Sequence, residues 1–150
     1  MQHVETAPAI LVVEDDDLVQ SFLCRALAGL AGEVSARASG GAALDALEHA
    51  DFGLVLLDGL LPDVHGIEVA KQILGGRRGG TTAVCFVSGM LRHPQPMRCG
   101  ISALPKPLRV RELLSAATEL LEWRRMAASS TSLADRLVTL DQLAADLLVS

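Results

Sequence analysis

The stretch LVVEDDD, residues 11–17, places four consecutive carboxylates directly after a run of apolar and β-branched residues. An apolar run such as AILVV, residues 9–13, is typical of a strand that is buried on both faces of a parallel sheet. Neighbouring carboxylates repel one another, so four of them at the end of a buried strand require a source of compensation. Further apolar runs that end on polar residues follow along the chain, and together they define its fold.

Short apolar runs alternate with segments in which apolar residues recur at helical spacing. This alternation predicts an α/β fold whose parallel sheet is covered by helices on both faces. Five strands fit the doubly wound, flavodoxin-like order 2-1-3-4-5. The predicted strands are 9–13, 33–37, 52–58, 83–88 and 101–104, and the predicted helices are 17–30, 40–50, 66–74 and 108–126.

Five polar side chains are predicted to meet at one edge of this sheet. Glu14 and Asp15 follow the first strand, and Asp58 ends the third. In this topology the two strands are neighbours, and ligands bind beyond their carboxyl ends. Ser88 ends the fourth strand and Lys106 follows the fifth, which adds a hydroxyl and an ammonium group. Clustered carboxylates with room for water suit Mg²⁺, and a carboxylate beside Mg²⁺ can attack a phosphoryl group to form an acyl phosphate.

The motifs VVEDD, LVLLDGLLPDVHG, FVSG and LPKP, in this order and at strand ends, resemble the receiver domain of two-component response regulators over residues 9 to about 126. The resemblance implies that Asp58 is the phosphoacceptor. It also implies that Asp15 binds Mg²⁺ directly, that Glu14 binds it mostly through water, and that the backbone carbonyl of Leu60 completes the site.

The same resemblance gives roles to the groups around the phosphoacceptor. Ser88 takes the place of the hydroxyl switch residue, and Lys106 that of the lysine that contacts the phosphate. The bond between Lys106 and Pro107 corresponds to one that is usually cis in this family. Asp16 and Asp17 are instead expected to cap the following helix and to interact with its dipole. His65 is expected to be a solvent-exposed residue at the entry to a helix.

The predicted function is therefore a phosphorylation-controlled switch of protein interactions, and not an enzyme. A sensor histidine kinase or a histidine phosphotransfer protein would supply the phosphoryl group, and an unknown protein would receive the signal. A constitutive interaction module with a relic acidic site is the alternative. The stretch LVLLDGLLPD also resembles phosphatases of the haloacid dehalogenase type, but those carry a second Asp two residues after the first, where this chain has Leu60.

The connection GMLRHPQPMRCG, residues 89–100, departs from the ordinary family pattern. Pro94 and Pro96 would break a helix, so the fourth helix of ordinary receivers is predicted to be shortened or missing. The position of the family's switch aromatic, three residues before the lysine, is Ala103. The segment resembles a variant receiver group with a Phe-Ala-Thr-Gly-aromatic motif, in which a flexible loop replaces helix 4.

The predicted organisation is a receiver domain at residues 1–126, a linker at 127–132 and a C-terminal amphipathic helix at 133–149. An S-x-x-D pattern opens this helix, and its apolar residues repeat at heptad spacing. It is expected either to form a homodimer, which the spacing favours, or to fold back on its own receiver. The repeat consists of Leu133, Leu137, Leu140, Ala144 and Leu147.

Composition indicates which partners and which compartment the protein is expected to have. The formal net charge of −5 argues against a nucleic-acid surface. No apolar run approaches the ~20 residues that span a bilayer, and the N-terminus lacks the features of a signal peptide. Three scattered cysteines favour free thiols in a reducing compartment. We therefore expect a cytoplasmic protein without a nucleic-acid or membrane partner.

Overall fold

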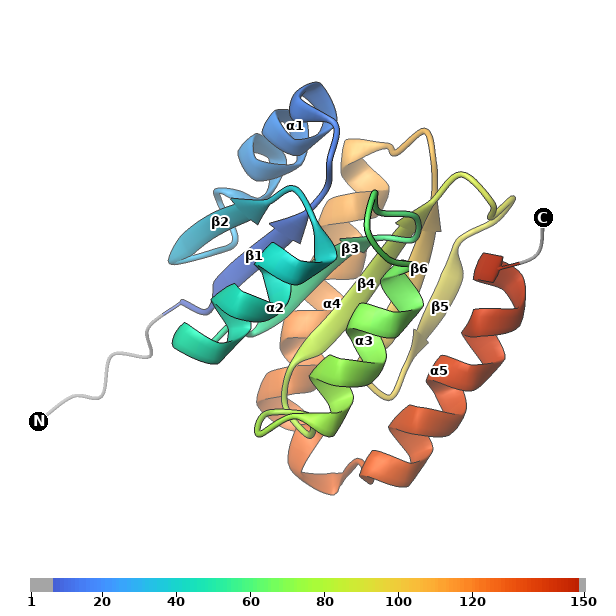
Figure 1. Cartoon of the computed structure of the whole chain (residues 1–150). Helices are drawn as coiled ribbons and strands as arrows, with labels where there is room; N and C mark the ends of the chain where they lie inside the picture. Colours follow the sequence, from blue (N-terminus) through green and yellow to red (C-terminus); the bar gives the residue numbers. More distant parts are fainter. Residues whose placement is uncertain (1–6, 149–150) are drawn as a thin grey trace, which may run out of the picture.

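A computed structural model describes residues 7–148 of the chain (Figure 1). Residues 1–6 of the predicted receiver domain and Val149 of the predicted last helix lie outside the described part. The strands are β1 (Ala9–Val13), β2 (Glu33–Arg37), β3 (Leu54–Asp58), β4 (Ala83–Ser88), β5 (Gln95–Arg98) and β6 (Ile101–Pro105). The helices are α1 (Asp17–Leu27), α2 (Gly40–His49), α3 (Gly66–Gly75), α4 (Val110–Met126) and α5 (Leu133–Leu148), with a 3₁₀ turn, η1 (Ala128–Ser130), before α5.

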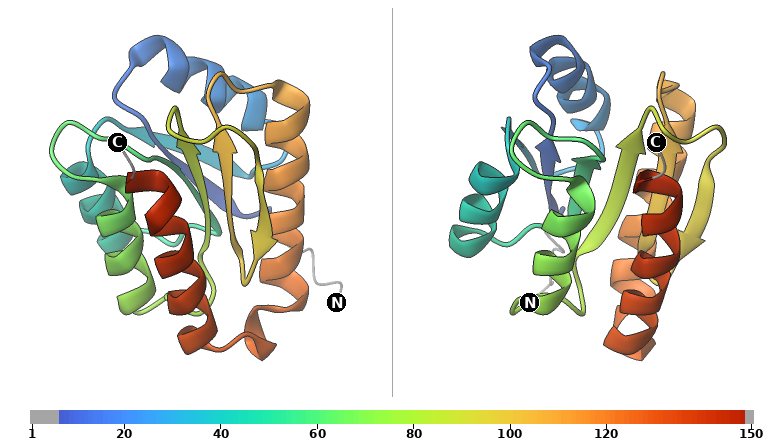
Figure 2. Two further views of the ribbon diagram at one scale, coloured as in Figure 1. Left: turned by 90° about the vertical axis from the view of Figure 1, so that its right-hand side faces the viewer. Right: turned by 45° about the vertical axis from the view of Figure 1, so that its right-hand side comes forward.

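The sheet is covered on both faces, as the alternation of apolar strands and helices predicts. Its order is β2-β1-β3-β4-β6-β5, and all neighbouring strands are parallel except β5 and β6. Helices α1 and α4 cover one face, and α2, α3 and α5 cover the other (Figures 1 and 2). Each face has its own apolar cluster, and Val, Leu, Ile and Ala supply most of both. Within residues 7–148, no helix has the length and apolar character needed to cross a membrane.

The sheet has six strands, and the predicted five-stranded sheet was therefore incomplete. The segment predicted as a flexible loop contains β5, which pairs with β6 as an antiparallel hairpin. Cys99 and Gly100, which connect the two strands, both have positive φ, of 54° and 74°. Such a two-residue turn matches the twist of a hairpin. Pro96 excludes a helix but is tolerated here because β5 is an edge strand.

Helix α5 occupies the face that the missing helix leaves open. No helix lies between β4 and β6 in the described chain, and α5 instead packs against α3 and β6. The docked face consists of Leu140, Leu143 and Leu147 rather than of the full heptad repeat. Leu133 and Leu137 remain exposed. A homodimer of this conformation could use only these two leucines of the repeat, because the chain itself covers the others.

Arg136 fastens the N-terminal half of α5 and is completely buried. Its guanidinium donates hydrogen bonds to the backbone carbonyls of Cys99, at 2.9 Å, and of Gly79 and Thr82. It also lies over the ring of Trp123, 4.6 Å from the centroid. Burial lowers the pKa of Arg136 to about 10, which leaves the side chain charged at neutral pH. The positive charge is therefore satisfied by carbonyl dipoles and an aromatic face.

Candidate functional site

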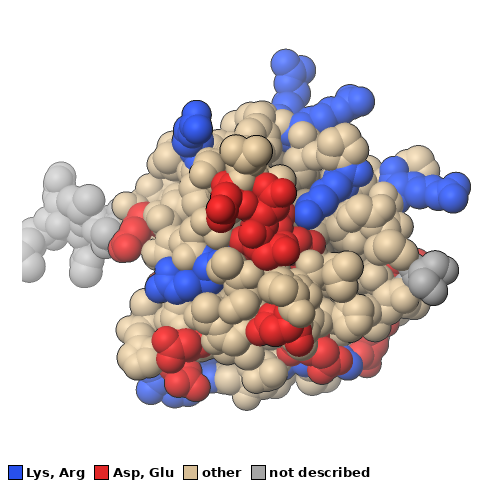
Figure 3. Space-filling view, turned by 45° about the horizontal axis from the view of Figure 1, so that its top comes forward, with Lys and Arg blue, Asp and Glu red and all other residues tan. Residues whose placement is uncertain are grey.

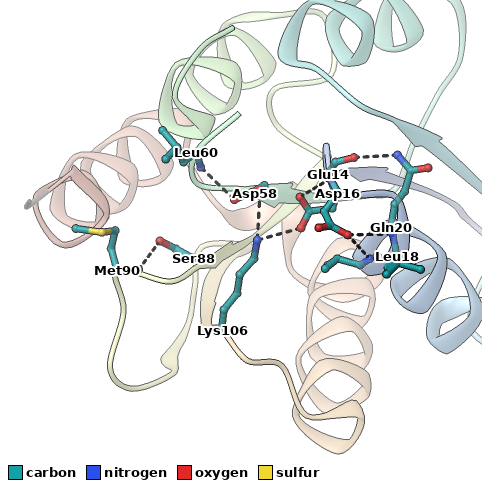
Figure 4. Close-up of polar contacts among 10 residues, drawn as sticks. Glu14, Asp16, Leu18, Gln20, Asp58, Leu60, Ser88, Met90 and Lys106 are labelled. Atoms are coloured by element: carbon teal, nitrogen blue, oxygen red, sulfur yellow. Dashed lines mark hydrogen bonds and ion pairs between the residues drawn. The ribbon is translucent and has the colours of Figure 1, made fainter. Parts of the chain in front are cut away.

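The three predicted carboxylates meet where β1 and β3 end, and Figure 4 shows two of them, Glu14 and Asp58. The strands are parallel neighbours with Val13 opposite Leu57, which brings Glu14 and Asp15 next to Asp58. One carboxylate oxygen from each of the three residues lies within 4.8 Å of the other two. Glu14 and Asp58 are only 2% and 7% exposed, whereas Asp15 faces solvent. Two buried negative charges so close together require a nearby cation.

Lys106 supplies that cation. Its Nζ lies 3.0 Å from Glu14 Oε1 and 3.3 Å from Asp58 Oδ2, so one ammonium group bridges the ends of β1 and β3 from the end of β6. Partial burial disfavours the charged ammonium, but the hydrogen bond to Glu14 and the attraction of Asp58 outweigh it and raise the pKa of Lys106. The Lys106–Pro107 peptide bond is cis, as the resemblance implied.

The acidic run also forms the N-terminus of helix α1. Asp16 is the N-cap residue, and its side chain accepts hydrogen bonds from the amides of Leu18 and Val19 at 2.9 and 3.0 Å. Asp17 lies in the first turn, where a negative charge favours the helix dipole. The capping role predicted for Asp16 is thus confirmed. The Asp16 amide in turn donates to Glu14 Oε2 at 3.3 Å, which ties the cap to the site.

Backbone amides hold the side chains of Asp58 and Ser88 in place. The Leu60 N–H donates to Asp58 Oδ1 at 3.1 Å, and the Met90 N–H donates to Ser88 Oγ at 3.0 Å. Ser88 is buried, and its hydroxyl is engaged with the start of the following loop (Figure 4). The side chains of Leu60 and Met90 are 67% and 48% exposed, so both present apolar surface beside the site.

The loop after β3 is held by contacts that the sequence analysis did not identify. Asp63 accepts hydrogen bonds from the amides of Gly40 and Gly41, both at 2.9 Å, and these two bonds lower its pKa. Its carboxylate therefore ties the loop to the N-terminus of α2. Gly66 approaches the backbone of Asp58 so closely that a Cβ there would collide with the Asp58 carbonyl oxygen. His65 is exposed, as expected, and its side chain makes no cap hydrogen bond.

The donor set fits a hard divalent cation. Three carboxylates with converging oxygens face one ammonium group, so the site has an excess of negative charge. Oxygen ligands of this kind, with one side open to water, suit Mg²⁺. The space-filling view shows a patch of acidic side chains on this face of the molecule, with basic side chains around it (Figure 3). Glu14, Asp15 and Asp58 are therefore the residues that could hold the metal.

Comparisons with known proteins agree with this geometry. The family model of the response regulator receiver domain matches residues 10–118. The response regulator receiver protein CpdR of Brucella abortus (strain 2308) is 27% identical over 116 residues, which cover 75% of this chain and 95% of that protein. The matched part ends within α4, so α5 lies outside the family model.

Solved structures show the same CheY-like α/β fold. A receiver domain protein from Methanospirillum hungatei JF-1 is 26% identical, with a TM-score of 0.67 over 80% of this chain and 98% of that one. The BeF3-activated receiver domain of DrrB is 26% identical, with a TM-score of 0.64 over 78% of this chain and 99% of that one. The variant group suggested by Phe86, Ser88 and Gly89 stays a prediction, because these matches are to receiver domains in general.

Proposed function

The chain belongs to the response regulator receiver domain family, whose members are phosphorylation-regulated switches of two-component signalling and not enzymes. From this premise we propose that it accepts a phosphoryl group on Asp58 from a histidine kinase or a histidine phosphotransfer protein. The observation that supports this assignment most is the pairing of Lys106 with both Glu14 and Asp58 at the junction of three strands. The phosphorylated form would then change its contacts with a downstream protein.

The proposed reaction transfers the phosphoryl group between two side chains. A carboxylate oxygen of Asp58 forms a bond to phosphorus while the bond between phosphorus and the donor's imidazole nitrogen breaks, and the electron pair of that bond stays on nitrogen. Mg²⁺, when bound by Glu14, Asp15, Asp58 and the carbonyl of Leu60, supplies positive charge for the phosphoryl oxygens. Lys106 would exchange its contact with Asp58 for a phosphoryl oxygen, and the Ser88 hydroxyl would donate to another.

Labelling with a small phosphodonor tests this assignment. Acetyl phosphate with Mg²⁺ is expected to add the mass of one phosphoryl group per chain, measured by intact-mass spectrometry. Asp58→Asn should abolish the added mass because no carboxylate remains to attack. Asp45→Asn is the matched control, since Asp45 is an acidic residue on α2 away from the site, and should label normally. Label that persists in Asp58→Asn would refute the assignment, and an unlabelled wild-type chain would favour the constitutive interaction module.

The acyl phosphate is expected to hydrolyse slowly. Leu60 and Met90 flank the site with exposed apolar side chains, which cannot orient an attacking water by hydrogen bonding. Leu60→Asn or Met90→Glu should therefore shorten the phosphoryl lifetime by about tenfold. This is a smaller acceleration of hydrolysis than a fully positioned general base provides. The decay of the labelled mass measures this lifetime. Leu18→Asn is the control, because Leu18 is an exposed leucine on neighbouring α1. Equal lifetimes in all variants would show that these residues do not limit hydrolysis.

The compartment and the partners are part of the same proposal. Cys24, Cys85 and Cys99 are free thiols, which favours a reducing compartment such as the cytoplasm. Receiver domains partner with histidine kinases, and the kinase of this chain would approach the open side of the site, where Asp15 is exposed.

A further inference from the structure

Helix α5 is held to the rest of the chain by two different kinds of contact along its length. Its N-terminal half is fixed by polar bonds, because the Arg136 guanidinium donates to three backbone carbonyls that lie outside the helix. Among residues 7–148, no side chain from Leu140 to Leu148 forms a hydrogen bond or an ion pair. The C-terminal half is therefore held by apolar packing alone, through Leu140, Leu143 and Leu147.

The two halves also lie at opposite ends of the sheet. Two of the carbonyls that bind Arg136, those of Gly79 and Thr82, precede β4, and the third, that of Cys99, precedes β6. They thus lie at the amino ends of parallel strands whose carboxyl ends form the acidic site. The C-terminal end of α5 lies beside the loop between β4 and β5 in every view (Figures 1 and 2).

Two buried leucines close to the acidic site in the sequence share an apolar cluster with the C-terminal half of α5. Leu61 and Leu91 lie three residues after Asp58 and Ser88, and both are buried. They belong to the same apolar cluster as the leucines of α5. Leu91 follows directly after Met90, whose amide donates to the Ser88 hydroxyl. The orientation of the Ser88 hydroxyl therefore affects the position of Leu91, which belongs to the same cluster as the leucines of α5.

We propose that phosphorylation of Asp58 loosens the C-terminal half of α5, residues 140–148, while Arg136 keeps the N-terminal half docked. This inference rests on the function proposed above. When the Ser88 side chain rotates to donate its hydroxyl proton to a phosphoryl oxygen, the hydroxyl oxygen moves away from the Met90 amide, which loses its acceptor, and the loop rearranges. Leu91 moves with the loop, and the cluster beneath Leu143 and Leu147 loses a member. The packing on which this half depends is then weakened, and the apolar face beneath it becomes accessible.

Amide hydrogen exchange of the full chain with Mg²⁺ tests the proposal, in the presence and absence of beryllofluoride as the phosphoryl mimic. Residues 140–148 should exchange roughly tenfold faster with beryllofluoride, because local opening responds to the lost packing of one leucine. Residues 133–139 should keep their protection. Peptides that cover 58–62 and 88–91 report whether beryllofluoride binds, so the same measurement tests the two proposals separately.

A pair of neighbouring leucines provides matched variants. Leu147 is 5% exposed and Leu148 is 46% exposed, so the two substitutions differ in burial but hardly in position. Leu147→Ala should raise exchange in 140–148 without beryllofluoride and reduce the further increase on its addition. Leu148→Ala should behave like the wild type.

Three results would overturn the inference. If the site peptides respond while 140–148 do not, or become more protected, α5 does not report the state of Asp58, and the phosphoacceptor assignment stands. If residues 133–139 open together with 140–148, Arg136 does not divide the helix. If the site peptides and α5 are both unchanged, the proposed function fails and this inference fails with it.

Discussion

Arg136→Ala is expected to lower the free energy of unfolding by about 3–5 kcal/mol, the range for removing one partner of a buried charged interaction. The substitution leaves the carbonyls of Cys99, Gly79 and Thr82 without their donor and removes the cation from the ring of Trp123. Urea denaturation followed by far-UV circular dichroism measures the change. Trp123 fluorescence is less suitable, because the substitution alters the surroundings of that ring directly.

Arg98→Ala is the matched control for this experiment. Arg98 is an exposed arginine one residue before Cys99 in β5, and its loss should change stability by no more than about 0.5 kcal/mol. Equal effects of the two substitutions would show that Arg136 contributes no more than a surface arginine.

Gly100→Ala is expected to lower the free energy of unfolding by about 3 kcal/mol, through two independent effects. Gly100 has a φ of 74°, which disfavours any residue with a Cβ. The added methyl group would also overlap the ring of Trp123, which is packed in the core. The same denaturation measurement applies. Gly80→Ala is the control, because a Cβ at Gly80 meets nothing and its φ is ordinary, so a similar loss there would exclude this explanation.

The sequence was sufficient for the parallel sheet and for the residues that meet at its edge. Apolar runs such as AVCFVS, residues 83–88, have the length and continuity of strands that are buried on both faces, and β4 has these bounds. Asp58, at the end of such a run, needed only the strand order to be placed near Glu14. Such predictions succeed because a strand that is buried on both faces needs a continuous run of apolar residues, and this run is visible in the sequence itself.

Contacts that depend on distant parts of the chain could not be predicted in this way. Pro94 and Pro96 excluded a helix correctly, but the strand β5 depends on a turn at Cys99, a residue that rarely takes positive φ. Arg136 looked like an ordinary charged residue of an amphipathic helix, because its partners lie 37 to 57 residues earlier. Asp63 was part of a recognised motif, yet its bonds reach 22 and 23 residues back to α2.

The heptad repeat of α5 predicted only some of the leucines that are buried. Leu140 and Leu147 were identified as buried, and they are. The third buried leucine is Leu143 instead of Leu137. A straight helix that packs against a sheet and a neighbouring helix buries a different row of side chains from a helix in a coiled coil.

The position of α5 has a consequence for the synthesis of this protein on the ribosome. Chains emerge from their N-terminus and fold as they are made. In this chain, α3, β4 and β6 are complete before the helix that covers them, because α5 follows all three in the sequence. The nascent chain must therefore hold an uncovered apolar surface until α5 has also left the ribosome. A premature stop near residue 130 would leave that surface permanently open, and such a fragment is expected to associate with chaperones or to aggregate.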